Sequence, residues 1–149
     1  MEASQYPNVK TGQGYAVGHL DDLGEGPGFR KVRKGLGVSA FGVNALVIPE
    51  GIETRFHSHD VQEELYFVHR GVLEMEFGDG FVARLPEGTF ARVDAATPRK
   101  LRNVGEGDAI YLCAGGKDGY VGRDGRLADG EQAGDGPPGA VRAGPAGTV

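Results

Sequence analysis

The chain has 149 residues, of which 39% are hydrophobic and 25% charged. This composition is typical of one small globular domain and excludes a fibrous or wholly disordered chain. The formal net charge of −5 gives no electrostatic support for a nucleic-acid or anionic-membrane surface, so we expect neither partner.

In chain order, the sequence predicts a glycine-rich N-terminal arm followed by many short strands. The arm covers residues 1–28 and is expected to contribute one strand around 15–17. No stretch has a helical period, and Gly or Pro separates most of the apolar runs, which predicts an all-β barrel or sandwich. The expected strands lie at about 29–33, 38–48, 54–59, 64–69, 72–77, 81–85, 89–93, 98–103 and 109–113.

We expect the barrel domain to cover residues 29–117 and a Gly/Pro-rich tail to cover 118–149. Residues 129–149 have few large apolar side chains, so we expect them to be disordered or to lie on the surface. The turn-rich loop 119–126 is either a lid over the barrel mouth or a structural turn.

Metal-binding chemistry is indicated at the expected strand 54–59. His57 and His59 alternate with Ser58, so in an extended strand both imidazoles project from one face. A carboxylate on the neighbouring strand would complete a set of two histidines and one carboxylate, which is the facial set of non-haem Fe(II) oxygenases. The alternative is a pair of solvent-facing polar side chains without a metal.

The spacing around these histidines resembles the first signature motif of the cupin superfamily, reading Gly51-(5)-His57-x-His59-(4)-Glu64-(6)-Gly71. The resemblance implies a jelly-roll β-barrel of two antiparallel sheets. It implies His57, His59 and Glu64 as the metal ligands. It also favours Glu64 over its neighbour Glu63, which would point to the opposite face of a regular strand.

The second cupin motif, which supplies one more histidine, can be aligned in two ways. One alignment puts Ala91 at the histidine position and Ala95 at the asparagine position. The other keeps the full spacing and the final Asn103, and it puts Arg99 at the histidine position. We prefer the second alignment because it leaves room for a hairpin around residues 78–80, a strong turn signal. An arginine stays protonated and cannot coordinate a cation, so the fourth family ligand is replaced.

Two classes of function follow from the resemblance. In the first, one divalent transition metal serves an oxygenase or isomerase that acts on a small anionic organic molecule; Fe(II) is favoured, and Zn, Mn, Ni or Cu are the alternatives. Arg99 and the inward-facing Tyr66 are then the candidate catalytic residues. In the second, the barrel binds a small molecule without a metal, and Glu64 pairs with Arg99.

The remaining expectations concern location and assembly. A single cysteine, Cys113, and the lack of a charged-then-apolar leader suggest the reducing cytoplasm. The resemblance places Glu64 inside the barrel, so parity along the strand turns Tyr66 and Val68 inward. Leu65 and Phe67 then face outward and need cover from the N-terminal arm or a second subunit. Cupins commonly pair through such sheets, so we expect a homodimer.

Overall fold

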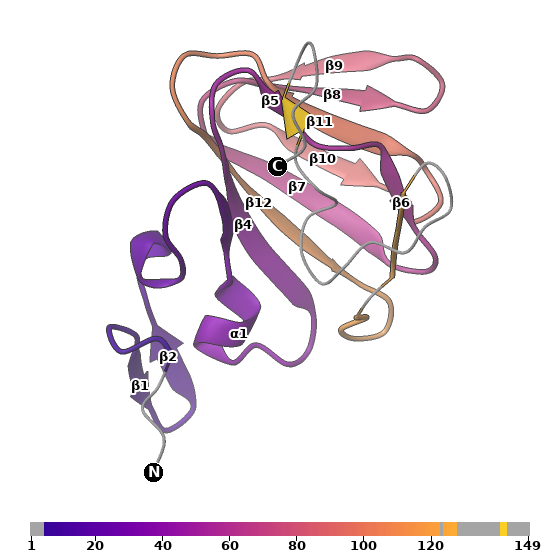
Figure 1. Ribbon diagram of the computed structural model, residues 1–149. Coiled ribbons are helices and arrows are strands. Elements are labelled where there is room, and N and C mark those ends of the chain that lie inside the picture. The colour runs from indigo at the N-terminus through magenta and orange to yellow at the C-terminus, as the bar shows by residue number, and fades with distance from the viewer. Residues whose placement is uncertain (1–4, 123, 128–140, 143–149) are drawn as a thin grey trace.

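Two antiparallel sheets pack face to face in the computed structural model, and a small N-terminal hairpin lies apart from them (Figure 1). The structure describes residues 5–122 and 124–127 and the backbone of 141–142. The fold is the all-β jelly-roll arrangement that the sequence predicts. In the described part of the chain, no helix is long and apolar enough to cross a bilayer.

The first sheet brings together strands that are distant in sequence. Its order is β10-β7-β12-β4-β3. The central strand β12 pairs with β4 through seven residues and with β7 on its other side, where Cys113 lies opposite Tyr66. The bounds are β3 (Gly28–Arg30), β4 (Gly42–Ile48), β7 (Glu63–Arg70), β10 (Phe90–Val93) and β12 (Ala109–Gly116).

The second sheet is organised around β11 (Arg99–Asn103). On one side β11 pairs along its whole length with β8, and β8 pairs in turn with β9. On the other side it pairs with β6 and then β5, so that Arg99 lies opposite His57. The bounds of its neighbours are β5 (Ile52–Glu53), β6 (His57–His59), β8 (Leu73–Phe77), β9 (Val82–Leu85), β13 (Gly125–Leu127) and β14 (Val141–Arg142).

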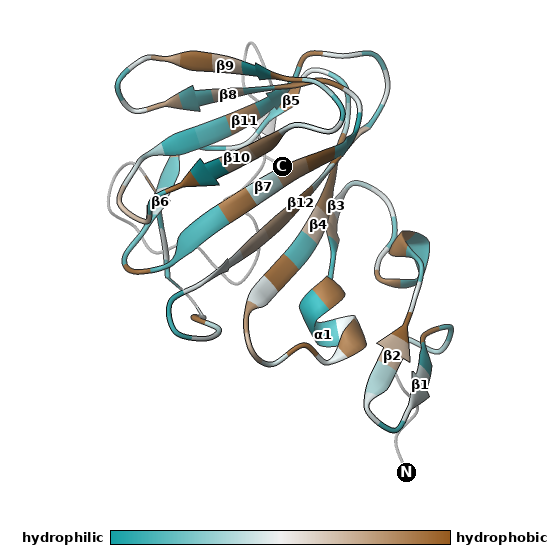
Figure 2. Ribbon diagram, turned by 180° about the vertical axis from the view of Figure 1, so that it is seen from behind, coloured by the Kyte–Doolittle hydropathy of each residue, from teal (hydrophilic) through white to brown (hydrophobic). Residues whose placement is uncertain are grey.

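The hydrophobic core fills the space between the sheets. Apolar and polar residues alternate along several strands (Figure 2). On β7 the side chains alternate in burial: Tyr66 and Val68 are only 3% and 1% exposed, whereas Leu65 is 42% exposed, which confirms the predicted parity. Each large apolar side chain buried in this way contributes about 1.5–3 kcal/mol. The core comprises Leu46, Ile48, Tyr66, Val68, Leu73, Met75, Leu85, Val93, Leu101, Ala109 and Tyr111.

The predicted hairpin between β8 and β9 is present. Gly80 adopts a φ of +91°, and the Asp79 carboxylate accepts a hydrogen bond of 2.9 Å from the Phe81 N–H. A positive φ favours glycine, as expected for a tight hairpin.

The N-terminal region differs from the expectation. The predicted strand 29–33 ends at Arg30, and a helix, α1 (Val32–Leu36), follows it. Gly37 caps this helix with a φ of +77°, and its N–H donates to the Arg33 carbonyl. Five residues are too few for a helical period to appear in the sequence. The arm also forms a hairpin, β1 (Lys10–Gly12) and β2 (Tyr15–Val17), followed by a 3-10 turn, η1 (Leu20–Asp22).

The predicted strand 54–59 is interrupted. β5 ends at Glu53 and β6 begins at His57, and between them Thr54 bonds to β11 with both its backbone and its side chain. The Thr54 N–H donates to the Leu101 carbonyl at 2.7 Å, and the Thr54 hydroxyl accepts from the Leu101 N–H at 2.9 Å. The hydroxyl thereby replaces a backbone acceptor.

Sheet pairing continues beyond residue 117, where we expect the barrel to end. β13 pairs with β6, and β14 pairs with β5. The rest of the expected unpacked tail, residues 128–140 and 143–149, lies outside the described residues.

Candidate metal centre

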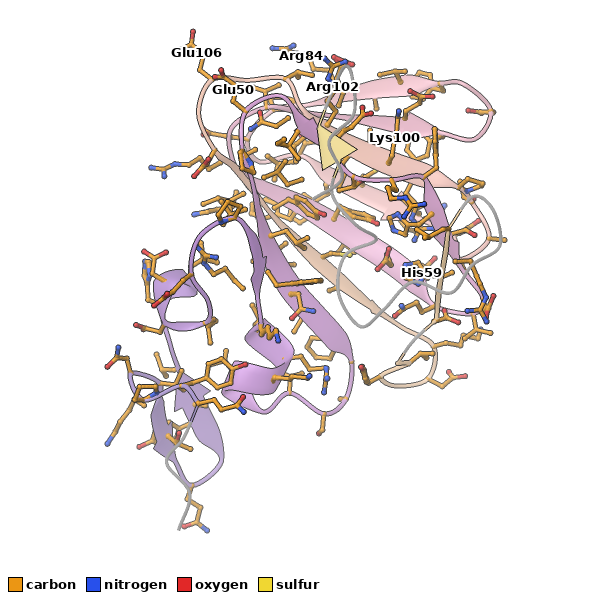
Figure 3. All side chains as sticks on the ribbon, viewed as in Figure 1. Glu50, His59, Arg84, Lys100, Arg102 and Glu106 are labelled. Atoms are coloured by element: carbon orange, nitrogen blue, oxygen red, sulfur yellow. The ribbon has the colours of Figure 1, made fainter. Side chains whose placement is uncertain are left out.

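The three residues singled out as ligands come from both sheets and meet inside the barrel. His57 and His59 lie on β6, and Glu64 lies near the start of β7. One ligand atom from each side chain lies within 4.8 Å of the others. His59 lies at the end of the barrel opposite to Glu50 and Glu106 (Figure 3).

His57 has the properties of a neutral metal ligand. Burial, together with the positive charge of Arg99, lowers its pKa to about 4, so the ring is neutral at pH 7. Its Nδ1 lies 3.3 Å from the backbone carbonyl oxygen of Arg55. A proton on Nδ1 would donate to that carbonyl and leave Nε2 for coordination, the usual arrangement of a ligating histidine.

His59 supplies the observation that best fits a metal. Its Nε2 is buried and has no hydrogen-bond partner among the described residues. That nitrogen lies 3.1 Å from Oε1 of Glu64 without the alignment of a hydrogen bond. Two ligand atoms bound at right angles to one ion, each at about 2.1 Å, would lie about 3 Å apart. The pair therefore has the separation of two ligands of the same cation.

Both carboxylate oxygens of Glu64 accept hydrogen bonds from neighbouring side chains. Oε1 accepts from the Tyr66 hydroxyl at 2.7 Å and from Nη2 of Arg99 at 2.6 Å, and Oε2 accepts from the Cys113 thiol at 3.2 Å. Burial alone would raise the pKa of Glu64, but His59, Arg99 and Tyr66 outweigh it and hold that pKa well below its usual range. The carboxylate is therefore ionised at neutral pH.

Tyr66 and Cys113 remain protonated beside this carboxylate. Burial and the nearby negative charge of Glu64 raise the pKa of both groups well above their ordinary values. Each group therefore acts as a hydrogen-bond donor that orients Glu64. The Tyr66 hydroxyl contacts Glu64 and Arg99 within the barrel wall, so the described contacts make it a positioning residue.

Arg99 is oriented differently from our sequence-based hypothesis, in which its guanidinium holds an anionic substrate. Its side chain has no exposed surface. Nη1 donates to the carbonyls of Asp94, Ala95 and Thr97, Nε donates to the Tyr66 hydroxyl, and Nη2 bonds to Glu64. With these bonds made internally, the guanidinium is not presented to a substrate.

The second motif also contains a structural asparagine. Asn103 is buried, and its amide nitrogen donates to the carbonyls of Ile48 and Gly107, while its oxygen accepts from the Gly105 N–H. These bonds fix the turn that leads from β11 to β12.

Glu63, the rival of Glu64, is exposed and forms an ion pair of 3.2 Å with Arg92 on the outer surface. It therefore lies away from the two histidines.

Sequence reasoning missed two residues next to the centre. Nε2 of Gln62 lies 2.9 Å from Nδ1 of His59, and the buried carboxylate of Asp124 lies 3.8 Å from the same nitrogen. Asp124 belongs to a turn-rich segment with no ligand spacing, so no pattern in the sequence points to it. Gln62 lies three residues from His59, which was the only available signal.

Comparisons with known proteins agree with this architecture. The family model described as "Cupin domain" matches residues 45–115. Among curated proteins, no sequence relative was found.

Solved structures of three other proteins share the fold. An uncharacterised conserved protein with a double-stranded β-helix domain from Klebsiella pneumoniae is 20% identical, with 75% of this chain and 96% of that one aligned and a TM-score of 0.62. A sugar phosphate isomerase from a cupin superfamily, from Silicibacter pomeroyi, is 22% identical over 68% of this chain, with a TM-score of 0.59. A cupin protein from Bacteroides fragilis is 19% identical over 66% of this chain and 83% of that one, with a TM-score of 0.56.

The aligned part spans 64% of the isomerase, which is less than two thirds of its length. At these identities the likeness shows the fold alone. The match over residues 45–115 identifies a cupin domain in this part of the chain.

Proposed function

We propose that this protein is a metal-dependent enzyme in which His57, His59 and Glu64 hold one divalent transition metal. The observation that carries the proposal is the buried Nε2 of His59, which lacks a hydrogen-bond partner in the described part of the chain and lies 3.1 Å from the Glu64 carboxylate. A buried polar atom without a partner is costly, and a shared cation would satisfy it.

Two histidines and one carboxylate favour Fe(II), with Zn, Mn, Ni and Cu as the other candidates. When bound, such a metal supplies Lewis-acid catalysis, and iron adds one-electron chemistry with dioxygen. The reaction classes that follow are oxidation or oxygenation and isomerisation. The protein's own contribution is to hold the ligands: Tyr66 and Cys113 donate to Glu64 and fix its orientation.

The proposed substrate is a small anionic organic molecule. A divalent cation and the Arg99 guanidinium together exceed the single negative charge of Glu64, so the loaded site would carry excess positive charge. Arg99 contributes through its field, since its nitrogens are engaged in the barrel wall. The single cysteine, Cys113, supports a reducing cytoplasmic location for such an enzyme.

A second candidate function is a metal-free small-molecule-binding cupin. One observation favours it: Nη2 of Arg99 already lies 2.6 Å from Glu64 and neutralises the carboxylate without a metal. In this alternative the two histidines form part of a polar ligand pocket.

Metal analysis separates the two candidates. The protein is purified without added metal, its metal content is measured by elemental analysis, and the apo form is titrated anaerobically with Fe(II) or with Zn(II) as a redox-inert probe. We expect about one ion per chain in the wild type and loss of most of it in His59→Ala. The matched control is His69→Ala, an exposed histidine at the far end of β7, which should retain the metal.

Failure of the wild type to bind either ion would favour the metal-free cupin. Unchanged stoichiometry in His59→Ala would show that the metal binds elsewhere.

A further inference from the structure

A buried carboxylate from outside the matched family region lies behind His59. Asp124 is 6% exposed and directly precedes β13, the strand that pairs with β6. Its Oδ2 accepts from the N–H groups of Val61 and Gln62 at 2.9 and 2.8 Å. The turn that connects β6 to β7, and thus His59 to Glu64, is therefore fixed by Asp124.

The same carboxylate is directed at the side of the His59 ring that faces away from Glu64. Its Oδ2 lies 3.8 Å from Nδ1 of His59. The side-chain amide of Gln62 also approaches this nitrogen, at 2.9 Å. The amide can turn either its nitrogen or its oxygen toward the ring. The Asp124 charge favours a proton on Nδ1, whereas the nearer Glu64 charge, 3.1 Å from Nε2, favours a proton on Nε2 in the metal-free protein. A cation held by Glu64 would remove the second preference, and the proton on Nδ1 would then need the amide oxygen as its acceptor.

We propose that Asp124 and Gln62 are positioning residues that hold the Nε2 of His59 directed at Glu64 and favour a proton on Nδ1. This inference rests on the proposed function, because an Nε2 that carries no proton is the form that can bind a metal. Asp124, which follows the matched family region, thus completes the support of the ligand set.

A purely structural role for Asp124 predicts something different. The segment is also held by the ion pair of 2.7 Å between Arg126 and Asp60 and by the Asp60 N–H, which donates to the Asp124 carbonyl. If Asp124 only anchors the segment, loss of the Arg126 ion pair should have the same effect on His59 as loss of the Asp124 charge. If Asp124 positions the ring, only loss of the Asp124 charge should affect His59.

The test compares Asp124→Asn, which keeps the size of the side chain and removes its charge, with Arg126→Ala as the matched control. Apo proteins are titrated with Zn(II). We expect a 10- to 100-fold lower affinity in Asp124→Asn, the usual effect of losing a partner of a metal ligand, and near wild-type affinity in Arg126→Ala. Equal losses in the two variants would overturn the positioning role.

A second measurement needs no metal. Long-range ¹H–¹⁵N spectra of the histidine rings report which nitrogen of His59 carries the proton in the apo protein. We expect the same fraction of His59 rings protonated on Nδ1 in the wild type and in Arg126→Ala, and a smaller fraction in Asp124→Asn. An unchanged fraction in Asp124→Asn would overturn the inference.

The two measurements also separate this inference from the proposed function. A wild type that binds no Zn(II), yet shows the expected change of tautomer, would refute the metal centre and leave the positioning of His59 intact. If Asp124→Asn does not fold, Gln62→Leu tests the positioning of His59 instead. This variant removes the side-chain amide and keeps the backbone N–H bonds to Asp124. Wild-type affinity and an unchanged tautomer in Gln62→Leu would overturn the proposal.

Discussion

Arg99 and Glu64 form an ion pair that joins the two sheets of the barrel, with Nη2 and Oε1 2.6 Å apart. Arg99 comes from β11 and Glu64 from β7, and neither side chain has much contact with solvent. In such a pair each charge is tolerated inside the protein because of the other. We therefore expect the pair to stabilise the barrel and to weaken the binding of a cation beside Glu64.

We predict that Arg99→Met destabilises the metal-free protein by about 3–5 kcal/mol, because it leaves the Glu64 charge buried without its partner. Zn(II) should stabilise this variant more than it stabilises the wild type, since the cation takes the place of the guanidinium beside Glu64. Urea denaturation with and without Zn(II) measures both effects.

The control for this experiment is Arg92→Met, which removes an exposed arginine paired with Glu63 and should change the free energy of unfolding little. Equal stabilisation of the wild type and Arg99→Met by Zn(II) would show that the Arg99 charge does not act on the ligand set.

Acid should destabilise the metal-free protein through His57. Its pKa is about 4 in the folded protein and about 6.5 when unfolded, so between these values the unfolded chain binds the extra proton. The stabilisation is complete above pH 6.5 and is lost as the pH falls toward 4. We expect a loss of about 2–3 kcal/mol between pH 7.5 and 4.5.

Chemical denaturation at the two pH values measures this loss, and His57→Asn should reduce it. A wild-type free energy of unfolding that does not change between pH 7.5 and 4.5 would contradict the depressed pKa of His57.

The sequence could predict which three candidate ligands meet because they are close together in the chain. His57 and His59 are two residues apart on one strand and Glu64 is five residues further on, so strand alternation and motif spacing were sufficient. Asp124 could not be predicted in the same way, since its bond to Gln62 spans 62 positions of the chain.

The orientation of Arg99 was also beyond sequence reasoning. Its position in the motif indicated that it lies near Glu64. Whether its guanidinium faces a substrate or the protein interior depends on the carbonyls of Asp94, Ala95 and Thr97, which accept its hydrogen bonds. These carbonyls converge on Nη1 only because of the turn that precedes β11.

Gly71, the last residue of the first motif, should tolerate substitution poorly. It has a φ of +84°, and a Cβ there would lie 3.0 Å from the Cβ of the fully buried Ala109. Gly80 has a similar φ of +91° and open space around it. We expect Gly71→Ala to cost more than Gly80→Ala, which should lose only about 1–3 kcal/mol to backbone strain. Equal melting temperatures of the two variants would show that Ala109 shifts freely.

The outer face of the first sheet carries an apolar patch that we expect a second copy of this chain to cover. The patch consists of Leu65, Phe67 and Phe90, and the rings of Phe67 and Phe90 lie 4.6 Å apart. Its rim bears both signs of charge, on Arg92 and Glu63, so two copies related by a twofold axis can place opposite charges together. On β11 and β8 of the second sheet, residues of opposite charge instead lie opposite each other, such as Lys100 and Glu76, or Arg102 and Glu74. Lys100 also forms an ion pair of 3.5 Å with Glu53.

Light scattering after gel filtration tests this assembly. We predict a homodimer for the wild type and a monomer for Phe90→Glu, because burying a carboxylate in an apolar contact is unfavourable. Phe81→Glu is the matched control: Phe81 is 63% exposed and Phe90 64%, but Phe81 lies on the β8–β9 hairpin of the other sheet. Its variant should remain dimeric. Dissociation by both substitutions would place the contact elsewhere, and a monomeric wild type would show that the patch has no partner of its own kind.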